Sequence, residues 1–344
     1  MKSQCSNQQF TRVLLSVVCL AIPWGLGCTD DSSPTVRSAQ EEAPVRVSLA
    51  LDWFPNSNHV GVFEAIAQGY FTEAGLDVNV YTPADPSSIL KLVGAGRDEF
   101  GISYQPDLLL ARSEGIPVVS VISIVQHPLN SIMTLGESGL VRPGMLAGKK
   151  VGYPGIPLNE GLVATMLEAD GSSIDEISLI DVGFDLVPAL LSGTVDAVVG
   201  AYWTHESILM ELEGHSVNIM RMEDWGVPDF YELILVTSES NLSERSDLVN
   251  KFVQAFRKGF EFAEANPQDS ITTLIDANPE TINEPLERKG VELLQPLWMD
   301  GVSTFGWQDG ERWEHFSDWM KRRGLIDDDL VASSAFTNEF VRNE

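Results

Sequence analysis

The fold of this chain is decided by one stretch, Leu51-Asp52-Trp53-Phe54-Pro55-Asn56-Ser57-Asn58-His59-Val60-Gly61. The apolar run before it, residues 45–51, predicts a buried strand, and the amphipathic run after it, residues 62–72, predicts a helix. A strand-to-helix turn lies at the carboxyl end of its strand, where open α/β sheets bind their ligands. An aromatic pair alone would be typical of a connector packed into the core. Because small polar residues and a histidine crowd the same turn, we interpret it as a binding loop.

Strand and helix patterns alternate in two successive units. The first unit has expected strands at 45–51, 76–81, 100–104 and 117–125, and the second at 149–153, 177–182, 197–200 and 217–221, with a helix expected at 202–213. An apolar strand at 232–237 reads as the return crossing to the first unit, and the chain after 240 is helical. The predicted fold is α/β, with two lobes, two mostly parallel sheets and helices on both faces of each sheet.

The two crossings divide the chain into lobes. The expected first lobe comprises residues 45–132 plus 239–344, and the expected second lobe comprises 133–238. A hinge is expected near 131–135 and 236–240.

The first 27 residues predict a signal peptide, because a weakly basic start precedes a short apolar run at 13–22. Small residues before Cys28 resemble the lipobox of bacterial lipoproteins, which predicts lipidation of that cysteine; the alternative is an ordinary secretory signal with a chance cysteine. Residues 28–44 are polar and predict a flexible tether. We therefore expect an exported protein held at the cell membrane only by a lipid anchor, facing the periplasm or the exterior.

Charge and composition exclude several classes of function. The 50 acidic residues outnumber the 22 basic ones and give a net charge of -28, which would repel nucleic acid. The three cysteines all lie in the leader, so the mature chain has no thiolate metal site and no cysteine nucleophile. The five histidines show no metal-ligand spacing, and dinucleotide, P-loop and hydrolase motifs are missing. We expect no enzyme activity, no cofactor and no metal.

Aromatic and polar side chains recur just past the ends of the expected strands. If these ends face each other across a cleft, the aromatic rings would stack on a flat ligand and the polar groups would contact its edge. Each residue also has a structural interpretation: a tryptophan can simply pack a helix onto its sheet, and a histidine is more often a cap than a catalyst. The candidate ligand-binding residues are Asp52, Trp53, Asn58, His59, Tyr104, Gln105, Tyr153, Asn159, Tyr202, Trp203, Tyr231 and Glu232.

The same segments carry a family resemblance. Residues 52–59 resemble the substrate-binding proteins of ABC importers for thiamine pyrimidine precursors, which in turn resemble the yeast pyrimidine-precursor synthase. The similarity continues through 68–71, 75–78, 83–86, 101–106, 148–153, 195–201 and 226–233. The synthase branch has a cofactor-binding lysine and a donor histidine in the segment where this chain has Ser103 and Asp107, and its cysteine-rich run is missing here.

The resemblance implies a hinged periplasmic-binding-protein fold of type II. It also implies a monomeric binding protein that delivers a small heteroaromatic ligand to an ABC permease and its ATPase. The ligand implied first is formylaminopyrimidine or hydroxymethylpyrimidine. Riboflavin is the alternative, since an aromatic clamp suits any flat ring system, and a synthase-like enzyme is a third hypothesis.

Overall fold

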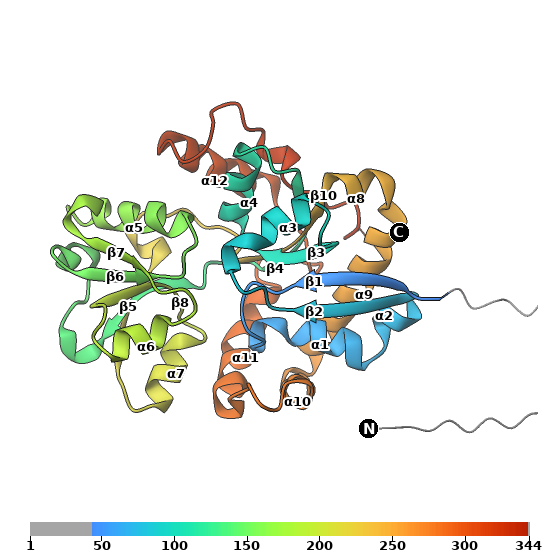
Figure 1. The fold of residues 1–344 in the computed structure, drawn as a ribbon, viewed down its shortest axis with the longest axis horizontal. Coiled ribbons are helices and arrows are strands. Elements are labelled where there is room, and N and C mark those ends of the chain that lie inside the picture. Colours follow the sequence, from blue (N-terminus) through green and yellow to red (C-terminus); the bar gives the residue numbers. More distant parts are fainter. Residues whose placement is uncertain (1–42, 343–344) are drawn as a thin grey trace, which may run out of the picture. The chain divides into compact units, whose positions relative to one another are not determined.

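The computed structural model describes residues 43–342, so the expected signal peptide, Cys28 and nearly all of the tether lie outside the described residues. These residues form two five-stranded sheets (Figure 1). The first sheet has the order β2 (Leu76–Tyr81), β1 (Val45–Ala50), β3 (Phe100–Ser103), β10 (Leu233–Ser238), β4 (Val118–Val125). The second has the order β7 (Ser178–Asp181), β6 (Lys150–Tyr153), β8 (Ala197–Tyr202), β5 (Asn130–Leu135), β9 (Val217–Arg221).

Each sheet is mostly parallel, as predicted, with one antiparallel strand. In the first sheet β10 runs antiparallel to its neighbours β3 and β4, while β1 pairs in parallel with β2 and β3. In the second sheet β5 runs antiparallel to β8 and β9. Both antiparallel strands are the first that the chain forms after it passes from one sheet to the other. A strand can join a parallel neighbour only through a crossover connection, usually a helix. β5 and β10 instead enter their sheets from the opposite lobe, without such a connection.

Strand pairing moves the expected lobe boundaries. Residues 130–132 belong to β5 of the second sheet, and residues 233–238 belong to β10 of the first sheet. We therefore use "first lobe" for residues 45–125 and 233–342 and "second lobe" for residues 130–225, with crossings at 126–129 and 226–232. The expected hinge positions fall in or against strands that pair on both sides, so the crossings are the segments free to bend.

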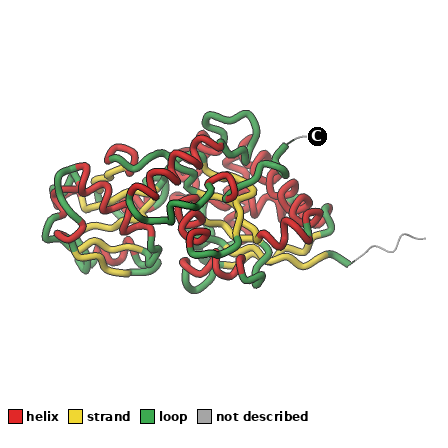
Figure 2. Tube along the Cα trace, turned by 90° about the horizontal axis from the view of Figure 1, so that it is seen from above, coloured by secondary structure: helices red, strands yellow, loops and turns green. Residues whose placement is uncertain are grey.

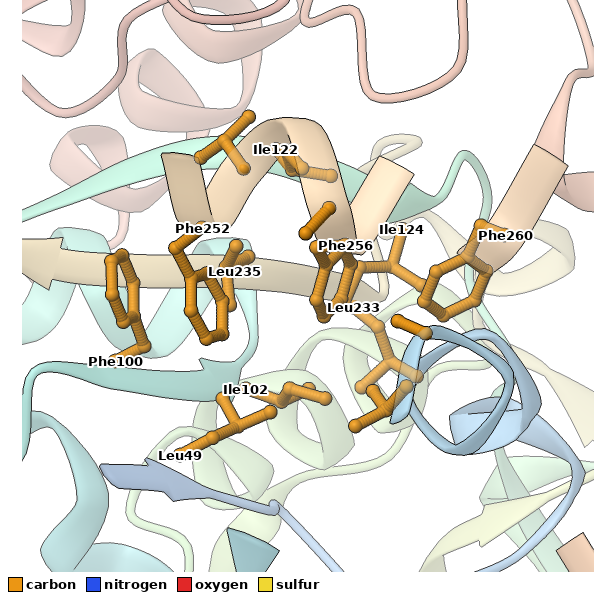
Figure 3. Packing of buried hydrophobic residues seen from close by; sticks show 14 of the residues in the cluster. Leu49, Phe100, Ile102, Ile122, Ile124, Leu233, Leu235, Phe252, Phe256 and Phe260 are labelled. Atoms are coloured by element: carbon orange, nitrogen blue, oxygen red, sulfur yellow. The ribbon is translucent and has the colours of Figure 1, made fainter. Parts of the chain in front are cut away.

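Helices cover both faces of the first sheet, and β10 shows the division. Its residues Leu233 and Leu235 join the apolar cluster that contains Phe252 and Phe256 (Figure 3). Ile234, between them, belongs to the cluster on the opposite face. The first face carries α1 (Val60–Ala67), α2 (Tyr70–Glu73), α9 (Ser246–Ala265), α10 (Pro267–Ala277) and α11 (Glu284–Trp298). The second carries α3 (Ile89–Gly94), α4 (Gln105–Ser113) and α12 (Gly310–Arg322), and α8 (Glu239–Glu244) follows β10 directly.

The second lobe repeats this layering, with strands between helices (Figure 2). One face of its sheet packs against α5 (Leu158–Ala169), and the other against α6 (Leu186–Leu191) and α7 (Glu206–Leu212). Short 3₁₀ helices occupy Ser57–His59 (η1), Pro86–Ser88, Gly136–Ser138, Pro143–Leu146, Ile174–Glu176, Met222–Trp225 and Ala332–Ser334. Within residues 43–342, every helix is too short or too polar to cross a membrane.

The helix that follows the binding loop, α1, packs very closely against α9. A Cβ atom added to Gly61 of α1 would lie 2.2 Å from the Phe260 ring, and one added to Gly259 of α9 would lie 2.0 Å from the carbonyl oxygen of Gly61. Only glycine fits at both positions, so α1 and α9 pack backbone to backbone directly beneath the loop.

Candidate functional site

One pocket is lined by residues of both lobes. It encloses about 600 Å³ of space not filled by protein atoms, part of it open to solvent. The ends of β1, β3, β6 and β8 all lead into it, which is the predicted position at the carboxyl ends of the strands. Its lining residues are Asp52, Trp53, Asn56, Tyr104, Pro106, Asp107, Asn130, Pro154, Ile156, Leu158, Asn159, Leu162, Gly200, Tyr202, His205, Glu206, Phe230 and Glu232.

Half of the candidate residues line this pocket, namely Asp52, Trp53, Tyr104, Asn159, Tyr202 and Glu232. The structure places the other half elsewhere: Asn58, His59, Gln105, Tyr153, Trp203 and Tyr231. The other lining residues were not predicted as ligand contacts. They are Asn56, Pro106, Asp107, Asn130, Pro154, Ile156, Leu158, Leu162, Gly200, His205, Glu206 and Phe230.

His59 is the buried histidine of the binding loop, and its ring forms a hydrogen bond with Asp52. The backbone N–H of Asn56 donates to His59 Nδ1 at 3.2 Å, which leaves the ring proton on Nε2, and Nε2 donates to Asp52 Oδ1 at 2.9 Å. The Asn56 side chain in turn accepts from the Asn58 backbone N–H at 2.8 Å, so Asn56 and His59 form a capping box on η1. For His59 the geometry favours the helix cap over a ligand-edge contact, and Asn58 donates its backbone N–H and Nδ2 to the side chain of the capping Asn56.

Asp52 connects this loop to the first tyrosine of the pocket. Its Oδ2 accepts a hydrogen bond from the Tyr104 hydroxyl at 3.0 Å. Burial, followed by the negative charge of Asp52, raises the pKa of Tyr104 well above its ordinary value. Burial and the charge of Glu232 do the same to the pKa of Tyr202. Both phenols stay protonated at neutral pH, and both residues line the pocket. The hydroxyl of Tyr104 spends its one proton on Asp52, so towards a ligand it can only accept a hydrogen bond.

Two carboxyl groups of the pocket titrate near neutrality, the buried Glu232 and the half-buried Asp107. Burial raises the pKa of Glu232 to about 7, even though its Oε2 accepts from the backbone N–H groups of Leu129 at 2.6 Å and Asn130 at 3.0 Å. Burial, with the charge of Glu232, also raises the pKa of Asp107 to about 7. Near pH 7 this pair can therefore present both a proton donor and acceptor oxygens to a ligand.

An amide chain forms the second-lobe side of the pocket. The Gly200 backbone N–H donates to Asn130 Oδ1 at 2.9 Å, and Asn130 Nδ2 donates to Asn159 Oδ1 at 3.1 Å. Asn159 Nδ2 makes no hydrogen bond to another described residue and is free for a ligand. Gly200 has φ +94°, and an added Cβ would lie 2.9 Å from Pro154 Cδ, so a larger residue would disturb this wall.

The two lobes meet at His205. Its Nδ1 lies 3.0 Å from Glu206 Oε1 in the second lobe, and its Nε2 lies 3.2 Å from Glu287 Oε1 on α11 of the first lobe. Burial alone would lower the pKa of His205, but the charge of Glu206, and then that of Glu287, raises it to about 10. Glu287 also accepts from the Ser57 backbone N–H at 2.6 Å. The protonated imidazole thus joins the binding loop to the second lobe.

Aromatic rings meet where the binding loop approaches the second lobe. The Trp53 ring packs edge-on against Phe184 with centroids 4.5 Å apart, and Phe54 lies 4.7 Å from the same ring. Trp53 lines the pocket, whereas Phe54 is half exposed and does not. Trp53 is therefore held in place by a residue of the opposite lobe.

The remaining candidates support the crossings between the lobes. Gln105 Oε1 accepts from the Tyr231 backbone N–H at 2.8 Å, and the Tyr231 hydroxyl accepts from the Asp309 backbone N–H at 2.5 Å. Trp203 Nε1 donates to the Pro128 carbonyl at 3.2 Å. Tyr153 is half-buried at the end of β6 and packs against apolar side chains.

The pocket is acidic. Four of its lining residues are carboxylic acids, Asp52, Asp107, Glu206 and Glu232, and none is lysine or arginine. The protonated His205 is also in the lining, but it is paired with Glu206 and Glu287. A phosphate or sulfonate group would therefore meet mainly repulsion, whereas amines and amides would find acceptors. No group of three or more histidine, aspartate or glutamate side chains within residues 43–342 is placed to hold a metal ion.

Comparisons of this chain with known proteins agree on one protein family. The profile of the NMT1/THI5-like family matches residues 56–270. The formylaminopyrimidine-binding protein of Halalkalibacterium halodurans is 38% identical over 311 residues, which cover 89% of this chain and 94% of that protein. The riboflavin-binding protein RibY of Chloroflexus aurantiacus is 26% identical over 91% of both chains.

Two further similarities are more distant. The 4-amino-5-hydroxymethyl-2-methylpyrimidine phosphate synthase THI13 of Saccharomyces cerevisiae is 24% identical over 86% of this chain and 88% of that protein. The alkanesulfonate-binding protein SsuA of Xanthomonas axonopodis pv. citri superposes with a TM-score of 0.67 at 14% identity, over 86% of this chain and 99% of that one. The structural similarity confirms the two-lobed binding-protein fold and says nothing about the ligand.

Proposed function

Because this chain belongs to the NMT1/THI5-like family, we propose that it is the substrate-binding component of an ABC importer and captures a thiamine pyrimidine precursor, formylaminopyrimidine or hydroxymethylpyrimidine. The observation that carries this proposal is the pair of carboxyl groups, the buried Glu232 and the half-buried Asp107, in a pocket lined by aromatic rings and by no lysine or arginine.

An aminopyrimidine matches this pair chemically. Its exocyclic amine donates two hydrogen bonds, and the adjacent ring nitrogen accepts one. The Oε2 atom of Glu232 is occupied by two backbone N–H groups, so Oε1 is the oxygen that faces a ligand; with a pKa of about 7 it can donate a proton to the ring nitrogen when protonated or accept from the amine when ionised. Trp53 and Tyr202 offer faces for stacking, worth about 0.5–1.5 kcal/mol per aromatic pair beyond simple burial.

Riboflavin is the second candidate ligand. Four aromatic residues line the pocket, Trp53, Tyr104, Tyr202 and Phe230, which is generous for a single small ring. Riboflavin is also uncharged and carries N–H and O–H donors, so the acidic lining does not exclude it. The 26% identity to RibY keeps this candidate behind the pyrimidine precursors.

We propose binding without conversion. The histidine of the binding loop, His59, has both ring nitrogens occupied by Asn56 and Asp52 and does not line the pocket. The positions that match the lysine and histidine of the synthase branch hold Ser103 and Asp107.

Cellular placement is proposed from the leader. A signal peptide at 1–27 and lipidation at Cys28 would tether a monomeric binding protein to the membrane on its exported side, beside a permease and its ATPase.

Isothermal titration calorimetry on the purified chain tests the proposal. Formylaminopyrimidine, hydroxymethylpyrimidine, riboflavin and an alkanesulfonate are titrated in parallel, and the recovered ligands are examined by mass spectrometry. We expect saturable binding of a pyrimidine and recovery of it unchanged. Binding of the sulfonate alone, or appearance of a reaction product, would overturn the proposal.

A further inference from the structure

A second chamber adjoins the ligand pocket. It encloses about 590 Å³ of space not filled by protein atoms, part of it open to solvent, between α3, α4 and the segment that leads into α5. Tyr104, Asp107 and Ile156 line both the pocket and this chamber and therefore form the wall between them. The chamber therefore lies directly on the other side of these three side chains from a ligand ring in the pocket.

Asp107 stands in this wall without a protein partner. Its carboxylate makes no hydrogen bond or ion pair with another residue in the range 43–342. Asp52 and Glu232, by contrast, each accept two hydrogen bonds from the protein. Burial and the charge of Glu232 raise the pKa of Asp107 to about 7. The ionised form of Asp107 is therefore destabilised, because no hydrogen bond from the described residues compensates for the lost contact with water.

The chamber contains a second unused polar group in largely apolar surroundings. Ser103, at the end of β3, is only 3% exposed, and its hydroxyl makes no hydrogen bond to a described residue. Ile89, Leu90, Leu110, Ala111 and Ile116 supply an apolar lining, while Lys91 and Glu114 bring one charge of each sign to the same chamber. Such a space suits a short substituent with one or two polar atoms.

We propose that this chamber is a subsite for a side arm of the ligand, and that Asp107 accepts a hydrogen bond from an N–H or O–H donor on the arm as it leaves the ring. The inference rests on the proposed function and narrows it: the substrate class is a heteroaromatic ring with a donor-bearing arm, not a bare ring. The formylaminomethyl arm of formylaminopyrimidine and the hydroxymethyl arm of hydroxymethylpyrimidine both meet this requirement.

Calorimetry with ligands that differ only in the arm tests the subsite. Formylaminopyrimidine is compared with the same ring carrying a methyl group in place of the arm, on the unaltered chain and on Asp107→Asn. We expect the unaltered chain to prefer the armed ligand about tenfold or more, as a hydrogen bond to a charged group allows. Asp107→Asn should lose most of that preference while its affinity for the methyl analogue stays within about twofold.

Two further variants distinguish a loss of the subsite from a general loss of ligand binding. Leu110→Trp, at a half-buried position of the chamber, should weaken the armed ligand alone by filling the space. Glu160→Gln is the matched control, because Glu160 is also an acidic first-turn residue of a helix, is exposed and lines neither cavity. Unfolding curves of all three variants establish that they are folded.

The outcomes distinguish the two proposals. If both pyrimidines bind the unaltered chain equally, or if Asp107→Asn and Leu110→Trp leave the preference intact, the subsite is overturned and the proposed function stands. If neither pyrimidine binds but riboflavin does, the pyrimidine assignment fails, and the same comparison is made between riboflavin and lumichrome, its ring system without the hydroxyl-bearing arm.

Discussion

The Nε2 atom of His205, in the second lobe, lies 3.2 Å from Oε1 of Glu287, on α11 of the first lobe. Both side chains are largely shielded from solvent, and Glu287 also holds the binding loop through the Ser57 backbone N–H. The contact therefore ties closure of the two lobes to the conformation of the loop that carries Trp53.

Replacing Glu287 by Gln should weaken ligand binding about tenfold, mainly through faster release. The substitution removes one of the two charges that face His205, and a hydrogen bond to a charged group is worth about 1.5–3 kcal/mol. Stopped-flow tryptophan fluorescence measures the release rate. Glu284→Gln, on the exposed face of the same helix, is the control; equal release rates for the two variants would contradict the role of the contact.

The same contact predicts a dependence of stability on alkaline pH. The folded pKa of His205, about 10, lies above its ordinary value of 6.5. Its stabilising effect is thus fully present below about pH 6.5 and is lost as the pH rises through about 10. Melting temperatures measured from pH 6 to pH 10 should fall more steeply for the unaltered chain than for His205→Gln. The exposed His315 provides the control, since His315→Gln should leave the slope unchanged.

Asp107→Asn should stabilise the ligand-free protein at high pH. The folded pKa of Asp107, about 7, is raised above its ordinary 3.8, so the stability associated with its protonated form is present at low pH and lost as the pH rises through 7. The amide carries no charge to bury, and we expect a gain of at least about 1 kcal/mol at pH 8 with little difference at pH 4. Urea unfolding at the two pH values measures it. A variant that is less stable at pH 8 would show that Asp107 is paired in the free protein.

Trp53→Ala should weaken binding by at least about 1 kcal/mol if the indole stacks on the ligand. Phe54→Ala is the neighbouring control, because Phe54 shares the contact with Phe184 but does not line the pocket. Calorimetry with the same ligand compares the two variants. Unchanged affinity in Trp53→Ala would remove this residue from the site.

His59→Ala should act on stability before it acts on binding. It leaves the Asn56 backbone N–H and one oxygen of Asp52 buried without partners, at a cost of about 1–3 kcal/mol each. Chemical unfolding should show a loss of about 2 kcal/mol or more. Full stability combined with abolished binding would instead make His59 a ligand contact.

Local patterns were sufficient to predict most of the fold. The period of the apolar residues gave the strands and helices of both lobes, and it also gave Tyr104 and Glu232 as residues beside strand ends. It misplaced Tyr202, which was expected to begin a helix but is the last residue of β8, with the helix beginning at Glu206. The antiparallel course of β5 and β10 could not be predicted, because strand direction depends on the path between the sheets.

Side-chain direction explains the candidates that lie elsewhere. Tyr231 and Glu232 are neighbours in the chain, but Tyr231 packs in an apolar cluster against Trp313, and only Glu232 lines the pocket. Asn130, His205 and Glu206 were missed because they do not directly follow the end of a strand: Asn130 begins β5, and His205 and Glu206 lie at the start of α7. Asp107 could have been predicted from the sequence, because it lies in the first helical turn after Tyr104.

The late arrival of β10 has a consequence for how the chain folds. The second lobe is a continuous segment and can complete its sheet as soon as β9 is made. The first sheet cannot, because β3 and β4 are separated by a central strand that lies beyond the whole second lobe in sequence. Until β10 inserts, two strand edges rich in apolar residues stay unpaired, which slows folding and invites aggregation. A nascent or translocating chain truncated before Leu233 should therefore contain one folded lobe and one that depends on chaperones.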